Sequence, residues 1–200
     1  MGTIELPAPR LEGAVSVEEA IRRRRSRRSF ADSPLTPAQL GQLLWSAQGL
    51  TEGRKRAAPS AGATYPMEVF VAVGPAGVGS LEAGVYRYLP AEHALELHLA
   101  GDVRAQAAAA AGGQRFLADA PVDILLAADY ARTAQRYGER ARRYVDMEAG
   151  HISQNLYLQA EALGLGTVAV GAFDDPEVAR VFRLAANLAP LYLMPVGHVK

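Results

Sequence analysis

Residues 139–163 read ERARRYVDMEAGHISQNLYLQAEAL, and their pattern predicts the longest helix of the chain. Gly164 follows directly, and glycine is the residue that most often closes a helix. About 25 residues at a rise of 1.5 Å each span roughly 37 Å, about the width of a small domain. One stripe of the helix is apolar: Val145, Ala149, Ile152, Leu156 and Leu163. We therefore expect a central helix that crosses the whole domain.

Three further apolar residues of this helix lie off the stripe: Met147, Leu158 and Ala160. A helix that is apolar around more than one face must bury more than one face. Its second partner is either another subunit or the rest of the same chain wrapped around it. We expect a homodimer with the long helix at the interface, and the wrapped helix stays open as the alternative.

Around this helix the sequence predicts one α+β domain over residues 1–200, with residues 1–15 as an extended lead-in. Helices are expected after the Ser16–Glu19 capping box, after Thr36-Pro37, after Asp102 and at Asp175-Pro176. Apolar runs predict strands at 67–73, 85–89, 95–99, 122–128, 167–173 and 191–196. The runs at 67–73 and 122–128 lack polar alternation, which is typical of strands buried on both faces.

The composition excludes several classes of protein. The 200 residues contain no cysteine, which excludes disulfides, thiolate metal sites and cysteine nucleophiles. The formal net charge is zero, so no overall field attracts nucleic acid or an anionic membrane. No apolar run is long enough to span a bilayer. We expect a cytoplasmic protein that binds neither nucleic acid nor membrane.

A basic run and two loops carry the chemical signals. Six of the seven residues from Arg22 to Arg28 are arginine, and arginine forks match phosphate oxygens. Residues 59–66, PSAGATYP, predict a rigid loop whose backbone can approach a flat ligand. Residues 170–174, VGAFD, end a strand before a capped helix, where backbone donors are often free. Taken singly, these segments also fit a solvated basic face and two ordinary loops.

In order and spacing, the three segments resemble the nitroreductase family, most closely its SagB-type dehydrogenase branch. The matching blocks extend over most of the chain: residues 34–36, 43–49, 59–66, 84–88, 137–140, 149–156, 164–166, 170–175 and 194–197. The resemblance implies a nitroreductase-like fold with a central, mainly antiparallel sheet flanked by helices. It also implies noncovalent FMN in two equal sites at a homodimer interface.

Site residues are carried over by position. Those that resemble the phosphate and ribityl ligands are Arg24, Arg25, Ser26 and Arg28. Those that resemble the loop reaching the flavin from the other subunit are Pro59, Ser60, Ala61 and Gly62. Gly171 and Ala172 occupy the place whose backbone N–H faces flavin N5. The chain departs from classical members in having Gly171-Ala172 where they have Glu-Gly, and Ala63 where they have asparagine. It also ends at Lys200, where they continue into a tail.

The implied activity is ping-pong hydride transfer from NADH or NADPH through FMN to a small nitroaromatic or quinone-like acceptor. In azoline-oxidising members of the SagB-type branch, a Lys-Tyr pair before the long helix acts on the substrate. Arg136-Tyr137 matches that pair and gives the candidate catalytic residues. Because arginine cannot readily act as a base, we expect weak or no azoline oxidation. The alternatives are a SagB-type azoline dehydrogenase acting on modified peptides and a redox-inactive flavin-binding protein.

Two other signals are weaker. Glu148 and His151 form a single Glu-x-x-His, whereas di-iron bundles need two copies and further carboxylates, so we expect no metal. Gly74, Gly77 and Gly79 lack the spacing of a dinucleotide-binding Gly-x-Gly-x-x-Gly motif.

Overall fold

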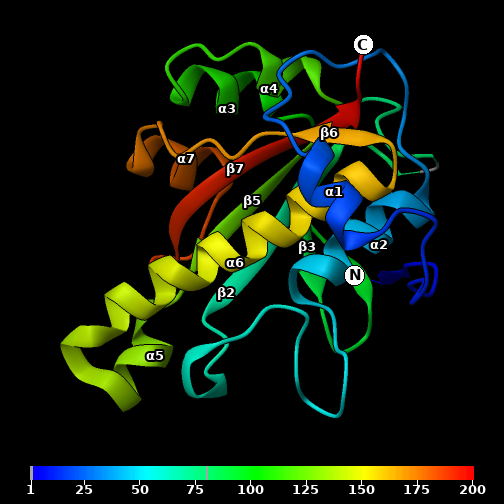
Figure 1. Ribbon diagram of the computed structural model, residues 1–200. Helices are drawn as coiled ribbons and strands as arrows, with labels where there is room; N and C mark the ends of the chain where they lie inside the picture. Colours follow the sequence, from blue (N-terminus) through cyan, green and yellow to red (C-terminus); the bar gives the residue numbers. More distant parts are fainter. Residues whose placement is uncertain (1, 80) are drawn as a thin grey trace.

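The computed structural model describes residues 2–79 and 81–200 and contains a seven-stranded sheet (Figure 1). Every neighbouring pair of strands is antiparallel, in the order β1-β4-β3-β2-β5-β7-β6. The strands are β1 (Thr3–Glu5), β2 (Met67–Val73), β3 (Gly84–Leu89), β4 (Ala94–Ala100), β5 (Val122–Ala128), β6 (Leu165–Thr167) and β7 (Ala189–His198). The expected antiparallel sheet is confirmed, and the extended lead-in supplies its edge strand β1.

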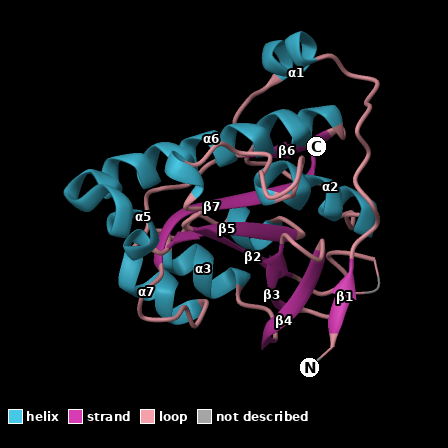
Figure 2. Cartoon of the chain, turned by 90° about the horizontal axis from the view of Figure 1, so that it is seen from below, coloured by secondary structure: helices cyan, strands magenta, loops and turns pink. Residues whose placement is uncertain are grey.

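Helices cover both faces of the sheet (Figure 2). One face carries α2 (Pro37–Gln48) and α6 (Ala141–Ala162), and the other carries α3 (Arg104–Ala110), α4 (Phe116–Asp119) and α7 (Asp175–Val181). Two further helices are α1 (Val17–Arg23) and α5 (Tyr130–Tyr137), and two single 3-10 turns are η1 (Ala61–Ala63) and η2 (Gly138–Arg140). Within the described part of the chain, no helix combines the length and apolar character needed to cross a membrane.

The two helical layers explain why β2 is apolar from Val69 to Val73. Val69 and Val71 pack into the core beneath α2 and α6. Phe70 and Ala72, which point the other way, pack into the core beneath α3, α4 and α7. Because successive side chains of a strand face opposite sides, a strand covered on both sides needs apolar residues throughout. The prediction that residues 67–73 and 122–128 are buried strands is confirmed.

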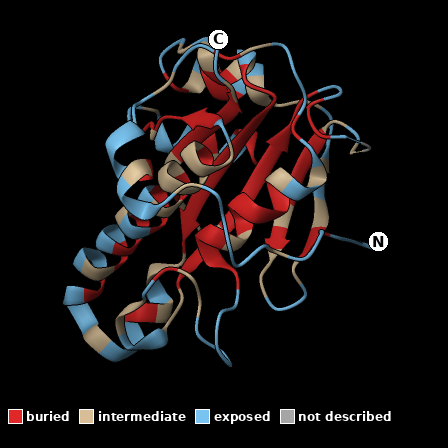
Figure 3. Cartoon of the chain, turned by 45° about the vertical axis from the view of Figure 1, so that its right-hand side comes forward, coloured by how far each residue is buried: buried red, intermediate tan, exposed pale blue. Residues whose placement is uncertain are grey.

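The long helix is confirmed, although α6 begins at Ala141 because residues 138–140 form the 3-10 turn η2. Its apolar stripe is buried against the sheet and α2. Of the three residues off the stripe, Ala160 is buried by its own chain, Leu158 is partly exposed and Met147 is 48 % exposed. The amino-terminal part of α6 extends with α5 beyond the sheet and is largely exposed on its outer side (Figure 3).

The expected strand at 167–173 is wrong in its bounds. The ladder with β7 covers only Leu165–Thr167, and Val170 rejoins β7 through a single bridge to Leu193. Val168 and Val170 are apolar because they pack beneath α7, although they do not extend the ladder. The segment 168–173 is therefore mostly irregular, which leaves Gly171 and Ala172 exposed next to the sheet.

Several predicted helix starts also shift. Asp174 caps α7, so Pro176 is its second residue and not its first. Helix α3 starts at Arg104, with Val103 at the cap position and the Asp102 carboxylate accepting from the Arg104 N–H. Ser16 caps α1 as expected, but the Glu19 carboxylate pairs with Arg22 and Arg23 instead of completing the box. The helices α4 and α5 were not predicted.

Candidate active site

The basic run leaves α1 and passes alongside β6. Ser26 forms a bridge with Thr167, and the Arg27 N–H donates to the Thr167 carbonyl at 2.9 Å. Arg22 and Arg23 are neutralised by Glu19, whereas Arg24 and Arg28 form no ion pair among the described residues. The run is therefore divided into a paired half on the helix and an unpaired half beside the sheet.

Arg25 turns back toward α1. Its guanidinium donates to the carbonyl oxygens of Arg22, Arg23 and Arg24, at 2.9, 3.3 and 2.9 Å. Cationic side chains are favourable at the carboxyl end of a helix, where the last carbonyls lack partners. Among the three arginines predicted to hold phosphate, Arg25 is therefore the one whose guanidinium is already hydrogen-bonded to the chain.

Tyr157 of α6 joins the basic run to the segment that contains Gly171. Its hydroxyl lies 3.1 Å from Ser26 Oγ and accepts a 2.8 Å hydrogen bond from the Ala169 N–H. The Arg24 guanidinium carbon lies 5.3 Å from the centre of the tyrosine ring. The structure thus brings the first and third predicted segments together. Sequence reasoning missed Tyr157, although it directly follows the matching block at 149–156.

Gly171 and Ala172 present free backbone donors. No hydrogen bond within the described residues uses either N–H group, and both residues are exposed. A Cβ built on Gly171 would come no closer than 3.4 Å to any neighbouring atom, the nearest belonging to Tyr192. The packing of the chain itself therefore does not require glycine here, and the missing side chain leaves room for a ligand.

Residues 59–66, which we call the Pro-Ser loop, are held in an unusual backbone conformation. Gly62, Ala63 and Tyr65 have φ of +60°, +53° and +46°. Residues other than glycine rarely adopt this region of backbone conformation. The Ser60 hydroxyl accepts from the Tyr65 N–H at 2.9 Å, and Arg136 donates to the Gly62 carbonyl at 3.3 Å. Backbone strain of this kind concentrates at functional sites.

The Pro-Ser loop lies away from the other two segments. Its Ser60 faces Glu148 in the first half of α6, whereas the basic run contacts Tyr157 in the second half. Nine residues of helix separate these two positions by about 14 Å. Within one chain, the structure therefore places the predicted loop beside the predicted catalytic pair, Arg136 and Tyr137, but not beside Arg24 or Gly171.

Glu148 is a buried acid behind the Pro-Ser loop. It is 2 % exposed, and burial raises the pKa of its carboxyl to about 7, against the opposing effects of Ser60, Arg56 and Gln48. Glu148 Oε1 and Gln48 Nε2 are buried without hydrogen-bond partners. The sequence singles out Glu148 only within the Glu-x-x-His pattern with His151, from which we expect no metal, and His151 is exposed. Among the described residues, no group of three or more histidine, aspartate or glutamate side chains gathers to hold a metal.

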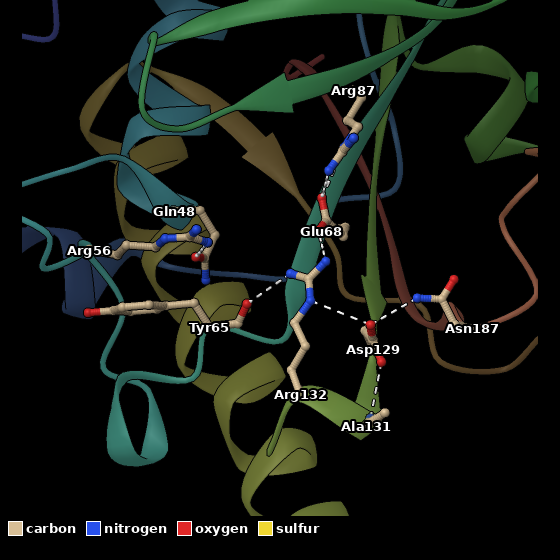
Figure 4. Close-up of polar contacts among 9 residues, drawn as sticks. All are labelled: Gln48, Arg56, Tyr65, Glu68, Arg87, Asp129, Ala131, Arg132 and Asn187. Atoms are coloured by element: carbon tan, nitrogen blue, oxygen red, sulfur yellow. Dashed lines mark hydrogen bonds and ion pairs between the residues drawn. The ribbon is translucent and has the colours of Figure 1, made fainter. Parts of the chain in front are cut away.

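A polar network fixes the exit of the loop into β2 (Figure 4). Glu68 accepts from Arg87 at 3.0 Å and from Arg132 at 2.5 Å, and Arg132 also donates to the Tyr65 carbonyl. Arg56 donates to Gln48 Oε1 at 2.6 Å, and its guanidinium carbon lies 4.6 Å from the centre of the Tyr65 ring. These contacts tie the loop to α2, β3 and α5.

A groove of about 770 Å³ lies elsewhere, between residues 8–20, α2 and the second half of α6. Trp45, Asn155 and Leu158 are among its lining residues, and none of the predicted site residues borders it. It therefore adds nothing to the candidate site.

Comparison with known proteins identifies the family to which this chain belongs. A model of the nitroreductase family matches residues 21–198. The chain belongs to the nitroreductase family. It is therefore an oxidoreductase, as the recognised motifs predicted.

Three relatives illustrate the match. The chain is 44 % identical over 197 residues to a protein of Methanocaldococcus jannaschii that carries a provisional nitroreductase name, covering 98 % of this chain and 97 % of that one. It is 30 % identical over 149 residues to the microcin B17-processing protein McbC of Escherichia coli, covering 72 % of this chain and 55 % of McbC. A crystal structure of a provisionally named nitroreductase from Ralstonia eutropha superposes with a TM-score of 0.86 at 31 % identity, covering 99 % and 90 % of the two chains.

Proposed function

We propose that this chain forms a homodimer that holds FMN noncovalently in two equal sites and transfers hydride from NADH or NADPH to a small acceptor. The proposal rests on the convergence of Ser26, Arg24 and Ala169, which lies two residues before Gly171, on Tyr157. A cationic cluster next to free backbone N–H groups suits a ligand with a phosphate at one end and a polar ring at the other.

The residues present fit FMN. Arg24, Arg28 and the Ser26 hydroxyl supply cationic and neutral donors for the phosphate and the ribityl chain. The free N–H groups of Gly171 and Ala172 supply donors for the ring, and the open space at Gly171 allows a flat group to approach. Bound FMN would supply the redox chemistry, accepting a hydride and passing it on.

The Pro-Ser loop supports a site shared between two subunits. Pro59, Ser60, Ala61 and Gly62 lie near Glu148, about 14 Å along α6 from Tyr157, and no hydrogen bond among the described residues joins them to the basic run. In a homodimer the same loop can reach the flavin held by the partner. The exposed apolar side chain of Met147 on α6 agrees with an interface there.

The residues of this chain would act by binding and orientation. Arg24 and Arg28 hold the phosphate, and the Pro-Ser loop closes over the ring and limits access of water. Stacking of donor and acceptor in turn on the same ring face supplies proximity. A nitroaromatic or quinone suits such a site because hydride transfer to it needs only a flat, electron-poor group next to the ring.

The main alternative is a SagB-type azoline dehydrogenase acting on modified peptides. Similarity to a microcin-processing protein favours it. Arg136 weighs against it, since an arginine replaces the lysine of the azoline-oxidising pair and cannot readily remove a proton. Incubation with an azoline peptide separates the two: loss of two hydrogens at a useful rate supports the alternative, with Tyr137 as the group that acts on the substrate.

The proposed function is tested by anaerobic mixing of the purified protein with NADH or NADPH. Bleaching of the flavin absorbance, followed by recovery on addition of a quinone, is the expected result. A flavin that stays oxidised with both reductants contradicts the proposal and favours a redox-inactive flavin-binding protein.

A further inference from the structure

A second basic cluster lies at the other end of α6. Residues 136–143 read RYGERARR, with four arginines and one glutamate, in a chain whose formal net charge is zero. We call Arg136, Arg140, Arg142 and Arg143 the arginine corner. All four are exposed, and none forms an ion pair among the described residues.

Two tyrosines hold part of this corner in place. The Arg136 guanidinium carbon lies 5.6 Å from the centre of the Tyr137 ring, and that of Arg140 lies 5.7 Å from the centre of the Tyr144 ring. Arg140 Nε also donates to the Tyr144 hydroxyl at 3.1 Å, and the two rings meet edge to face at 5.1 Å. A stacked guanidinium keeps its terminal N–H groups available for an anion.

The corner is joined to the Pro-Ser loop and is remote from the basic run. Arg136 donates to the Gly62 carbonyl, and a Cβ on Gly62 would lie 2.7 Å from the Tyr137 hydroxyl. Seventeen residues of chain, nearly all α6, separate Arg140 from Tyr157, which corresponds to about 25 Å. One phosphate cannot neutralise two clusters that far apart, so the FMN phosphate leaves the corner unfilled.

In the proposed site, the arginine corner also lies at the end where the flavin ring would be. If the Pro-Ser loop covers the ring of the flavin held by the partner, the corner stands beside that ring and not beside its phosphate. Hydride donors and acceptors must enter at the ring. A nicotinamide dinucleotide carries its reactive ring and its anionic groups on one molecule, and therefore places phosphates near this entrance.

We propose that the arginine corner binds the phosphate groups of the nicotinamide dinucleotide that reduces the flavin. This inference rests on the proposed function and gives its site a substrate preference. Arginine forks bind phosphate oxygens in pairs, and the extra phosphate of NADPH offers more of them than NADH. In the reduction itself, the dihydronicotinamide loses a hydride and is oxidised, the flavin gains that hydride, and the corner only binds. NADPH is therefore the preferred reductant, through its affinity and not its maximal rate.

The test is anaerobic stopped-flow reduction of the FMN-loaded protein by NADPH, NADH and N-benzyl-1,4-dihydronicotinamide, an uncharged hydride donor. The variants are Arg140→Ala, Arg143→Ala and the double substitution. Arg180→Ala is the control because it removes a positive charge from α7, on the opposite face of the sheet. Each corner substitution is expected to raise the apparent Kd for NADPH about tenfold and that for NADH less. The limiting rate and all constants for the uncharged donor stay unchanged.

Two outcomes overturn the inference: corner variants that bind both dinucleotides as the wild type does, and corner variants that impair the uncharged donor equally. Failure of the proposed function looks different. There, the wild-type protein binds no FMN, or its FMN is reduced by none of the three donors, and the inference falls with it.

Discussion

The hydroxyl of Tyr157 lies 3.1 Å from Ser26 Oγ, across 131 residues of sequence. The same oxygen accepts from the Ala169 N–H, so one phenol links the basic run to the segment that presents Gly171 and Ala172. Two distant parts of the candidate flavin site therefore depend on one side chain of α6 for their relative position.

Replacing Tyr157 by phenylalanine tests this link. The ring and its stacking with Arg24 are retained, while Ser26 and the Ala169 N–H lose their common partner. We expect the Kd for FMN to rise about 5- to 30-fold, which corresponds to about 1–2 kcal/mol for one or two hydrogen bonds. Fluorescence titration of the apoprotein with FMN measures it. Tyr86→Phe, which removes a hydroxyl bonded to the Glu82 carbonyl, is the matched control and should bind FMN normally. Equal Kd values for both variants would refute the role of Tyr157.

Gly62 tests the Pro-Ser loop. A Cβ there would lie 2.7 Å from the Tyr137 hydroxyl and 2.9 Å from Arg136 Cδ, at a φ of +60°. Gly53 has a φ of +58° but no atom within 4 Å of an added Cβ. Gly62→Ala and Gly53→Ala should therefore share a backbone cost of about 1 kcal/mol in the free energy of unfolding. Only Gly62→Ala should also lose FMN. Denaturant unfolding measures the backbone cost in both variants, and the FMN content of the purified proteins measures cofactor binding. Normal FMN content in Gly62→Ala would contradict a role of the Pro-Ser loop in binding FMN.

Burial of Glu148 predicts that the stability of the protein depends on pH. Its carboxyl has a pKa of about 7 in the folded chain, raised by burial above the ordinary value of 4.5. Between these two values the folded state binds the proton and the unfolded state releases it. The free energy of unfolding should therefore fall as pH rises from about 4.5 to about 7, by an amount on the order of 2 kcal/mol.

Urea unfolding of wild type and Glu148→Gln across this range measures the effect. In Glu148→Gln the free energy of unfolding should depend less on pH, because the variant lacks the carboxyl group that titrates. Asp123 is also fully buried with a raised pKa, so Asp123→Asn serves as a second comparison for the remaining slope. If Glu148→Gln leaves the dependence unchanged, Glu148 ionises normally in the folded protein.

Much of the fold follows from local pattern. Residues 67–73 and 122–128 match their strands because two helical layers require apolar side chains on both faces, and such runs are visible in the sequence. The capping box of Thr36 with Gln39 marks α2 in the same way. The segment 167–173 shows the limit: Val168 and Val170 are apolar because α7 covers them, and periodicity does not distinguish that packing from a strand.

The candidate site was predictable in its types of residue but not in its geometry. The density of arginine in 22–28 identifies an anion-binding segment, yet the sequence does not reveal that Glu19 neutralises Arg22 and Arg23 or that Arg25 caps α1. Nor does it reveal Tyr157 as the connecting residue, because its two partners lie far away in sequence. Glu148 was likewise missed as the buried neighbour of Ser60, since burial is a property of the packed chain.

Mixed dimers test most directly whether the basic run of one subunit and the Pro-Ser loop of its partner form one flavin site. Arg24→Ala chains and Gly62→Ala chains, each expected to lose FMN alone, are co-expressed with different tags, and the mixed dimer is purified through both tags. A shared site predicts that one site in each mixed dimer has neither substitution, so FMN content returns to half that of the wild type. A site built within one chain predicts a substitution in every site, and a mixed dimer that remains without FMN would contradict the account.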